Sequence, residues 1–287
     1  MRLLRFGEPR QEKPGILDDN GVIRDLSGII PDITPATIDD GLMDRLRDVD
    51  LESLPAVDSA VRIGPCVNRP GKIVCIGLNF KDHADEAGME RPSEPIIFMK
   101  ATTSICGPSD NIILPRGYKK VDWEIELGVV IGQRASYLDE ASAADVIAGY
   151  CLVNDISERS FQLDRNGQWT KGKSADTFCP LGPWLVTKDE IRDPGNLHMH
   201  LELDGQVYQD SSTAQMIFHV PALVSYVSHF MTLEPGDIIA TGTPAGVGMG
   251  QTPQVYLKPG SQLVLKIAGL GEQRQTAVEL DDLKAVG

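Results

Sequence analysis

The segment of residues 121–132 limits the possible folds of this chain more than any other. Its apolar residues occupy every second position, as a β-strand with one buried face requires: Trp123, Ile125, Leu127, Val129 and Ile131. The opposite face carries Glu124 and Glu126, followed only by Gly128 and Val130. Because small and apolar residues follow the two acids, this face is not an ordinary solvated surface. The segment therefore predicts a sheet strand that presents two carboxylates together.

These two carboxylates indicate an oxygen-lined cation site. Glu124 and Glu126 lie about 7 Å apart along a strand, and they repel each other unless a positive charge lies between them. Mg²⁺, Mn²⁺ or Ca²⁺ would suit, because hard divalent cations prefer oxygen ligands. Asp155 ends another apolar strand and is a natural third ligand. The alternatives are an edge strand whose glutamates face water and, for Asp155, the N-cap of the turn that follows.

A short segment after the apolar strand of residues 72–80 contains a candidate general base. His83 and Glu86 are three positions apart, so they lie side by side on one helical turn. A carboxylate next to an imidazole orients the ring and raises its basicity, which suits general-base catalysis. The alternative is a surface histidine beside a solvated glutamate.

Further polar residues could complete a pocket for an anionic substrate. Lys100 ends an apolar strand and Lys173 lies in a segment interrupted by Gly and Pro, so each could supply positive charge or simply reach solvent. Arg159 and Gln162 have i, i+3 spacing and can face the same way. Thr243 adds a hydroxyl to a glycine-rich loop whose N–H groups could bind an anion.

Charge and composition restrict the class of partner. The formal net charge of −14 argues against nucleic acid or an anionic membrane as a partner. The five cysteines form no C-x-x-C pair, which indicates reduced, mostly buried thiols rather than metal ligands. The sequence shows neither a signal peptide nor an apolar run of membrane-spanning length. We therefore predict a cytoplasmic protein that binds neither nucleic acid nor an anionic membrane.

The chain divides by pattern into two parts. Residues 1–65 are predicted to form a small α+β leading module, with a hairpin turn at residues 18–21 and a helix that begins at Thr34-Pro35. Residues 66–287 are predicted to form the catalytic domain, and a Pro- and Gly-containing linker precedes its first strand.

Three further elements are expected in the second part. Residues 139–149 are predicted to form a helix with Asp139 as N-cap and Gly149 as C-cap. A hairpin is predicted over residues 198–207, and a helix that packs on a sheet is predicted to start at Pro221.

In this order, the motifs resemble those of the fumarylacetoacetate hydrolase family. The motifs are Gly77-Leu78-Asn79-Phe80 with His83 and Glu86, Trp123-Glu124-Ile125-Glu126-Leu127, Asn154-Asp155, Lys173-Ser174, and Gly236-Asp237-Ile238-Ile239-Ala240-Thr241-Gly242-Thr243-Pro244. They cover roughly residues 70–270, and their fixed order over that length makes the resemblance specific. The leading module resembles the variable first domain of bacterial members.

The resemblance implies a fold, an assembly and a metal. The fold would be α+β and β-rich, a mixed β-sandwich roll with a small N-terminal module, usually in a homodimer. The metal would be Mg²⁺ (or Mn²⁺) on Glu124, Glu126 and Asp155.

The resemblance also implies roles for the other residues. His83 and Glu86 match the catalytic dyad of the family, on a segment that often closes over substrate, and Lys173 joins them as a catalytic residue. The residues that fall where relatives contact substrate oxygens are Lys100, Arg159, Gln162, Lys173 and Thr243. Glu158 departs from the pattern, because many relatives have a small residue there.

Within the family, the chain is similar to bacterial 2,4-diketo-3-deoxy-L-rhamnonate (or L-fuconate) hydrolases through residues 119–124 and 246–250. This similarity implies a hydrolase of C–C bonds in ketonic substances that forms pyruvate and L-lactate in L-rhamnose or L-fucose catabolism. The alternatives are an acylpyruvate hydrolase, an oxaloacetate decarboxylase and a ureidoglycolate lyase. A non-enzymatic keto-acid-binding protein is a fourth, and the intact His83, Glu86 and Lys173 argue against it.

Overall fold

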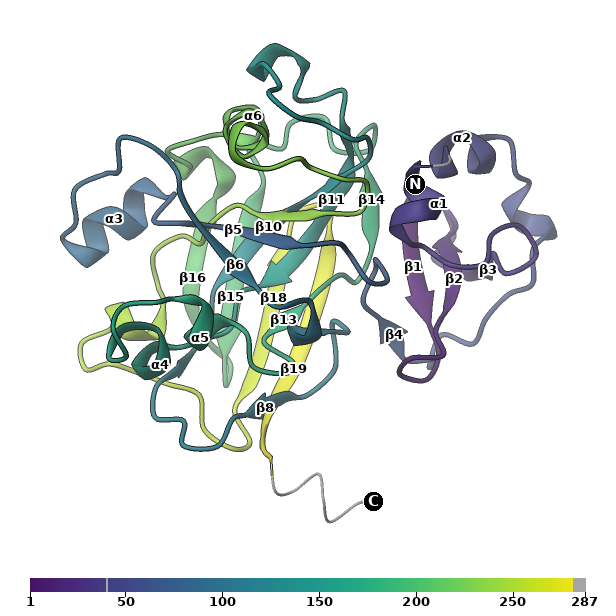
Figure 1. Ribbon diagram of the computed structural model, residues 1–287. Coiled ribbons are helices and arrows are strands. Elements are labelled where there is room, and N and C mark those ends of the chain that lie inside the picture. Colours follow the sequence, from purple (N-terminus) through teal and green to yellow (C-terminus); the bar gives the residue numbers. More distant parts are fainter. Residues whose placement is uncertain (40, 281–287) are drawn as a thin grey trace.

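Two β-sheets organise the computed structural model, which describes residues 1–39 and 41–280 (Figure 1). The larger sheet has ten strands, and nine of them follow the order β3 (Ile23–Asp25), β2 (Lys13–Leu17), β1 (Arg2–Phe6), β14 (Leu185–Thr187), β11 (Ile147–Asn154), β10 (Ile125–Ile131), β17 (Ile238–Ala240), β5 (Ile73–Gly77) and β6 (Ile96–Lys100). The tenth, β4 (Ile63–Gly64), pairs with β1. The smaller sheet has the order β16 (Gln206–Ser212), β15 (His198–Leu203), β18 (Gln262–Ile267), β19 (Gly271–Glu279) and β8 (Ile112–Leu114). Each sheet contains one parallel pair, β17 with β5 and β19 with β8, so both sheets are mixed.

Short strand pairs and helices complete the fold. The pairs are β12 (Ser157–Glu158) with β9 (Val121–Asp122), and β13 (Cys179–Pro180) with β7 (Ile105–Cys106). The helices are α1 (Pro35–Asp39), α2 (Leu42–Arg47), α3 (Lys81–Ala87), α4 (Arg159–Leu163), α5 (Thr170–Lys173) and α6 (Val220–Phe230). The predicted α+β, β-rich fold is therefore confirmed.

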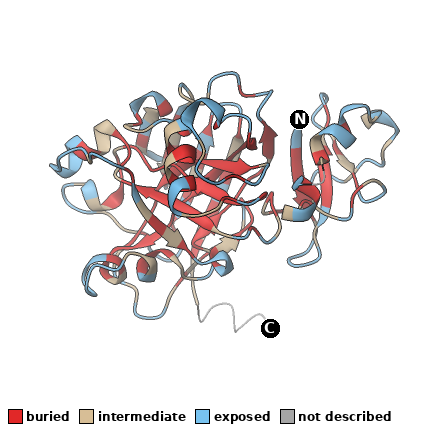
Figure 2. Cartoon of the chain, turned by 45° about the horizontal axis from the view of Figure 1, so that its top comes forward, coloured by how far each residue is buried: buried red, intermediate tan, exposed pale blue. Residues whose placement is uncertain are grey.

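Strand β10 explains how the layers pack. Its residues Ile125 and Leu127 belong to a hydrophobic core that also contains residues of the smaller sheet, such as Leu201 and Leu265. Val130 points to the opposite side, where it joins a second core. The predicted alternation of two faces is thus confirmed, although the strand is interrupted between β9 and β10. Figure 2 shows the buried residues concentrated on the strands, with exposed residues mainly on the surrounding loops.

The leading module supplies strands β1, β2, β3 and β4 to the larger sheet. Strand β1 pairs with β14 in the register Leu3 with Leu185, and Leu3 and Ile16 share the second core with Val130. The predicted hairpin is the pair β2–β3, and the predicted helix is divided into α1 and α2. The boundary near residue 65 stays a prediction.

The predicted helix over residues 139–149 is wrong. Only a 3₁₀ turn over Glu140–Ser142 forms, and strand β11 already begins at Ile147. Gly149 lies inside this strand, and a side chain there would collide with the main chain of Val186 on β14. The glycine therefore permits close approach of two strands and does not cap a helix.

The other two predicted elements are confirmed. The hairpin is formed by β15 and β16, and α6 packs its buried face, with Leu223 and Val227, into the first core. All five cysteines fall within the described residues, and all are buried and free. Within residues 1–39 and 41–280, no helix has both the length and the apolar character needed to cross a bilayer.

Candidate active site

Three buried carboxylates meet where strand β10 of the larger sheet begins and its neighbour β11 ends. Glu124 precedes β10, Glu126 lies on it, and Asp155 follows β11 directly. One oxygen from each of the three lies within 4.8 Å of the others. The antiparallel register of Ile125 with Asn154 brings these chain segments together. The predicted metal ligands therefore form one oxygen-rich cluster, of the kind that Mg²⁺ or Mn²⁺ accepts.

Two buried lysines support this cluster. Lys173, the last residue of α5, donates hydrogen bonds through Nζ to Glu124 Oε2 (2.8 Å) and Asp155 Oδ2 (2.6 Å). Lys100, at the end of β6, donates to Asp155 Oδ1 (2.5 Å) and to the carbonyl oxygen of Ile156 (3.1 Å). Lys100 is fully buried behind Asp155, so in this structure it orients a carboxylate. Its predicted contact with substrate stays a prediction.

Arg159 links the cluster to a fourth carboxylate. Its Nη1 lies 2.6 Å from Glu124 Oε1 and donates to Gln162 Oε1 (3.1 Å), while Nε donates to Asp122 Oδ2 (2.8 Å). Its Nη2 is the one buried side-chain nitrogen or oxygen without a hydrogen-bond partner among the described residues. A buried donor without a partner is costly, so this atom is suited to an anionic ligand.

The electrostatics of the cluster favour a bound cation. Burial opposes the ionisation of Glu124, but Lys173 and Arg159, with a smaller contribution from His83, outweigh burial and lower its pKa to about 2. Burial, together with the charges of Asp155 and Glu124, instead raises the pKa of Glu126 well above its ordinary value. Neighbouring positive charge thus offsets the burial of Glu124 but not that of Glu126. A divalent cation between the carboxylates would supply the missing positive charge, so these residues fit the predicted metal.

His83 and Glu86 form the predicted dyad on α3. Nδ1 of His83 lies 3.2 Å from Oε2 of Glu86, and both side chains are only partly exposed (14% and 19%). The main-chain N–H of Gly246 donates to Glu86 Oε1 (3.0 Å), which fixes the carboxylate from the other side. Both residues line a cavity of about 550 Å³ between α3 and the loop of residues 247–254.

Asp122 and Gly250 are functional candidates that the sequence analysis missed. Besides Arg159, Asp122 accepts hydrogen bonds from the N–H groups of Gly248 (2.7 Å) and Met249 (3.0 Å), so it connects the carboxylate cluster to the loop that holds Glu86. A β-carbon at Gly250 would lie 2.5 Å from Cδ of Glu86. A sequence signal existed for Asp122, because it shares the i, i+2, i+4 face of Glu124 and Glu126.

The remaining predicted contacts lie near the cluster. Gln162 is buried beside Arg159. The hydroxyl of Thr243 donates to the carbonyl of Ile125 (2.9 Å) and accepts from Gln209 (2.8 Å). In this structure, the hydroxyl proton is therefore bound within the protein and is not offered to a substrate. The roles of Gln162 and Thr243 toward substrate stay predictions.

Glu158, the departure from the family pattern, has a structural role. Its carboxylate caps α4 by accepting from the N–H of Phe161 and from the hydroxyl of Ser160 (2.7 Å). It also accepts from the N–H groups of Lys119 (2.8 Å) and Lys120 (2.7 Å). Burial opposes its ionisation, but these hydrogen bonds prevail and lower the pKa of Glu158. Glu158 therefore holds the segment before β9 against the helix that carries Arg159.

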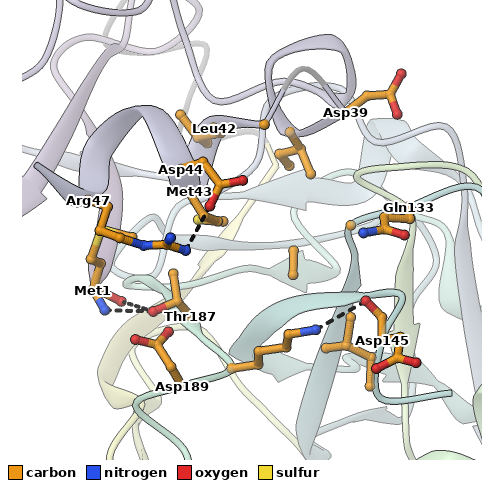
Figure 3. Close-up of a pocket in the computed structure, with 16 residues that line it drawn as sticks. Met1, Asp39, Leu42, Met43, Asp44, Arg47, Gln133, Asp145, Thr187 and Asp189 are labelled. Carbon is orange, nitrogen blue, oxygen red and sulfur yellow. Dashed lines mark hydrogen bonds and ion pairs between the residues drawn. The ribbon is translucent and has the colours of Figure 1, made fainter. Parts of the chain in front are cut away.

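A second cavity, of about 470 Å³, lies at the junction of the leading module and the larger sheet. Figure 3 shows Met1, Arg47 and Thr187 around it, and Thr187 accepts a hydrogen bond from the amino terminus (2.6 Å). None of the predicted catalytic or metal-binding residues lines this cavity.

Comparisons with known proteins show the family of this chain. Residues 72–278 match the protein family described as fumarylacetoacetate (FAA) hydrolase, C-terminal. A Burkholderia multivorans protein with the provisional name of hydrolase is 56% identical over 276 residues, which cover 96% of this chain and 98% of that protein.

Two solved structures are similar over nearly the whole chain. Fumarylacetoacetate hydrolase from Exiguobacterium antarcticum has a TM-score of 0.88 at 33% identity, covering 97% of this chain and 99% of that one. Maleylpyruvate hydrolase from a Sphingobium species, in complex with manganese(II) and pyruvate, has a TM-score of 0.81 at 28% identity, with the same two coverages.

Proposed function

Because the chain belongs to the fumarylacetoacetate hydrolase family, we propose that it is a metal-dependent hydrolase of the C3–C4 bond of 2,4-diketo acids. The observation that carries the proposal is the His83–Glu86 pair together with three clustered, buried carboxylates. The loop of residues 246–249 connects the two groups, because it donates hydrogen bonds to Glu86 and to Asp122, which binds Arg159. The manganese(II) and pyruvate in the maleylpyruvate hydrolase complex support the same combination of metal and keto acid.

The carboxylate cluster, with its metal ion and the side chains of Arg159 and Lys173, would bind the keto-acid end of the substrate. A divalent cation on Glu124, Glu126 and Asp155 would supply Lewis-acid polarisation of the 2-oxo group. Arg159 would donate its unpaired Nη2 to the substrate carboxylate. Lys173 uses two of its three N–H donors on Glu124 and Asp155, which leaves one for a substrate oxygen.

His83 would act as the general base. Glu86 holds the imidazole through Nδ1, so Nε2 is the nitrogen left to accept a proton from water. The water oxygen forms a bond to C4, and Lys173 stabilises the negative charge that develops on the C4 oxygen. The C3–C4 bond then breaks, and its electron pair goes to C3 as the enolate of pyruvate. The proton taken by His83 returns to C3, so the products are pyruvate and a carboxylic acid.

The specific substrate that we propose is 2,4-diketo-3-deoxy-L-rhamnonate. The reaction would convert it to pyruvate and L-lactate in non-phosphorylative catabolism of L-rhamnose. The L-fuconate analogue fits the same chemistry. The similarity of residues 119–124 and 246–250 to such hydrolases supports this choice. In the structure, Asp122 joins these two segments by accepting hydrogen bonds from the N–H groups of Gly248 and Met249, and Gly246 links the second segment to Glu86. The homodimer, the cytoplasmic location and the choice of Mg²⁺ over Mn²⁺ stay part of the proposal.

Product analysis on a small substrate panel tests this function. The panel is 2,4-diketo-3-deoxy-L-rhamnonate, acetylpyruvate, oxaloacetate and ureidoglycolate, each with Mg²⁺ and with EDTA. We expect metal-dependent release of pyruvate and L-lactate from the deoxy-sugar acid. Preferred release of CO₂ from oxaloacetate, or of glyoxylate and urea from ureidoglycolate, would refute the hydrolase assignment.

A His83→Ala variant tests the assignment of the base. The change should lower kcat by a factor of about 10²–10⁴, because general-base catalysis contributes about that much. A kcat/KM within a few-fold of the wild type would show that another group activates the water.

A further inference from the structure

The cavity beside the dyad has two different walls. His83, Glu86 and Met89 belong to α3 and the segment after it, and residues 247–254 form the opposite side. The cavity of about 550 Å³ is large enough for a short acyl chain. Because the water must attack C4 next to His83, the part of the substrate beyond C4 extends into this space. We call it the acyl cavity.

The acyl cavity offers no cation to a second carboxylate. Of the described residues that line it, only His83 and Glu86 are ionisable, and none is Lys or Arg. Lys81 and Arg91 lie on the same segment of the chain but do not line the cavity, and Arg91 is paired with Asp85 (3.4 Å). A carboxylate at the end of the acyl chain would therefore meet the negative charge of Glu86 without a cation to pair with.

The opposite wall is uncharged and only partly polar. Gln251 donates from Nε2 to the carbonyl of Val247 (3.2 Å), and Gln254 donates to the carbonyl of Met249 (3.0 Å). The amide groups are thus held by their own loop. Neutral amides and the hydroxyl of Thr252 can hydrogen-bond to substrate hydroxyls, while Met249 gives an adaptable apolar surface.

From this lining we infer that the acyl cavity selects substrates with an uncharged acyl group and rejects those that end in a second carboxylate. The inference rests on the proposed function, because it assigns the keto-acid end to the carboxylate cluster. Deoxy-sugar diketo acids and simple acylpyruvates belong to the selected class. Diketo acids with a dicarboxylic skeleton belong to the rejected class.

Binding of two 2-oxo acids tests the inference without any need for turnover. 2-Oxohexanoate and 2-oxoadipate share the keto-acid end and differ by the second carboxylate, and neither has a 4-oxo group to be hydrolysed. With Mg²⁺ in a calorimeter, we expect 2-oxoadipate to bind at least tenfold more weakly. Equal or tighter binding of 2-oxoadipate, or no binding of either compound, would overturn the inference.

A charge introduced on the far wall gives a second test. Gln251→Arg should tighten the binding of 2-oxoadipate at least tenfold and change that of 2-oxohexanoate less than threefold. Gln251→Met, of similar length but uncharged, should keep the wild-type preference. An unchanged ratio of the two dissociation constants in Gln251→Arg would count against this cavity as the acyl site.

A parallel assay of acetylpyruvate hydrolysis separates this inference from the proposed function. Discrimination between the two 2-oxo acids without any hydrolysis of diketo acids would support the acyl cavity and refute the hydrolase activity. Hydrolysis of acetylpyruvate together with equal binding of both 2-oxo acids would support the hydrolase activity and refute the selectivity assigned to the acyl cavity.

Discussion

Gly250 leads to a sharp prediction, because its missing side chain leaves room for the carboxylate of Glu86. A β-carbon at this position would lie 2.5 Å from Cδ and 2.7 and 2.8 Å from the two oxygens of Glu86. An ordinary contact needs about 3.5 Å, so the carboxylate would have to move by about 1 Å. The bond from Glu86 to His83 is already 3.2 Å long, and such a movement would disrupt the dyad.

The Gly250→Ala variant should lose activity and keep its stability. A misplacement of about 1 Å in a catalytic geometry costs about 10²-fold in rate, so we expect kcat to fall by about that factor. Gly250 is exposed and its φ is not positive, so alanine meets no backbone strain. The free energy of unfolding should therefore change by less than about 1 kcal/mol.

Steady-state pyruvate release and urea unfolding measure the two effects. Gly28→Ala is the matched control, because Gly28 is also exposed and a β-carbon there meets no atom within 4 Å. In a Glu86→Ala background, Gly250→Ala should cause little further loss, since the group that it displaces is gone. A kcat of Gly250→Ala within threefold of the wild type would show that the added methyl group does not displace the Glu86 carboxylate from His83.

Three other variants test the network around the site. Asp122→Asn should reduce the free energy of unfolding by about 3 kcal/mol in urea titrations, because it leaves a buried arginine with one charged partner fewer; a loss below 1 kcal/mol would contradict this. Glu126→Gln should raise the urea midpoint of the metal-free protein, since it removes a carboxylate whose pKa burial and neighbouring charges raise; an unchanged or lower midpoint would contradict this. Glu158→Gln should lower the free energy of unfolding by about 2 kcal/mol at pH 7, because a neutral amide accepts weaker hydrogen bonds than a carboxylate. Because the folded-state pKa of Glu158 is lowered, its contribution is present above the unfolded pKa of about 4.5 and disappears as the pH falls through the folded value; a cost that stays constant down to pH 3 would exclude this linkage.

The sequence was most informative where a local pattern and the tertiary structure impose the same constraint. The alternation along residues 121–132 placed Glu124 and Glu126 correctly, because both faces of β10 are covered and a strand has a period of two. His83 and Glu86 were paired correctly because one helical turn brings them together.

The sequence was least informative where distant segments decide the role of a residue. Gly149 has the spacing of a helix cap, but its neighbour across the sheet, Val186, makes it a strand glycine. Gly250 and Glu86 are 164 positions apart, so their contact leaves no trace in local spacing. The support of Asp155 by Lys100 is equally non-local, because it depends on how β6 and β11 end.

We propose that Glu124, Glu126 and Asp155 hold the catalytic cation. The most direct test is pyruvate release from 2,4-diketo-3-deoxy-L-rhamnonate while Mg²⁺ is titrated into the EDTA-treated protein, for the wild type and for Glu126→Gln. We expect no release in EDTA, saturable release with Mg²⁺ in the wild type, and loss of that response in the variant. Full activity in EDTA, or a Glu126→Gln variant with wild-type rate and Mg²⁺ dependence, would show that these carboxylates do not hold a catalytic cation.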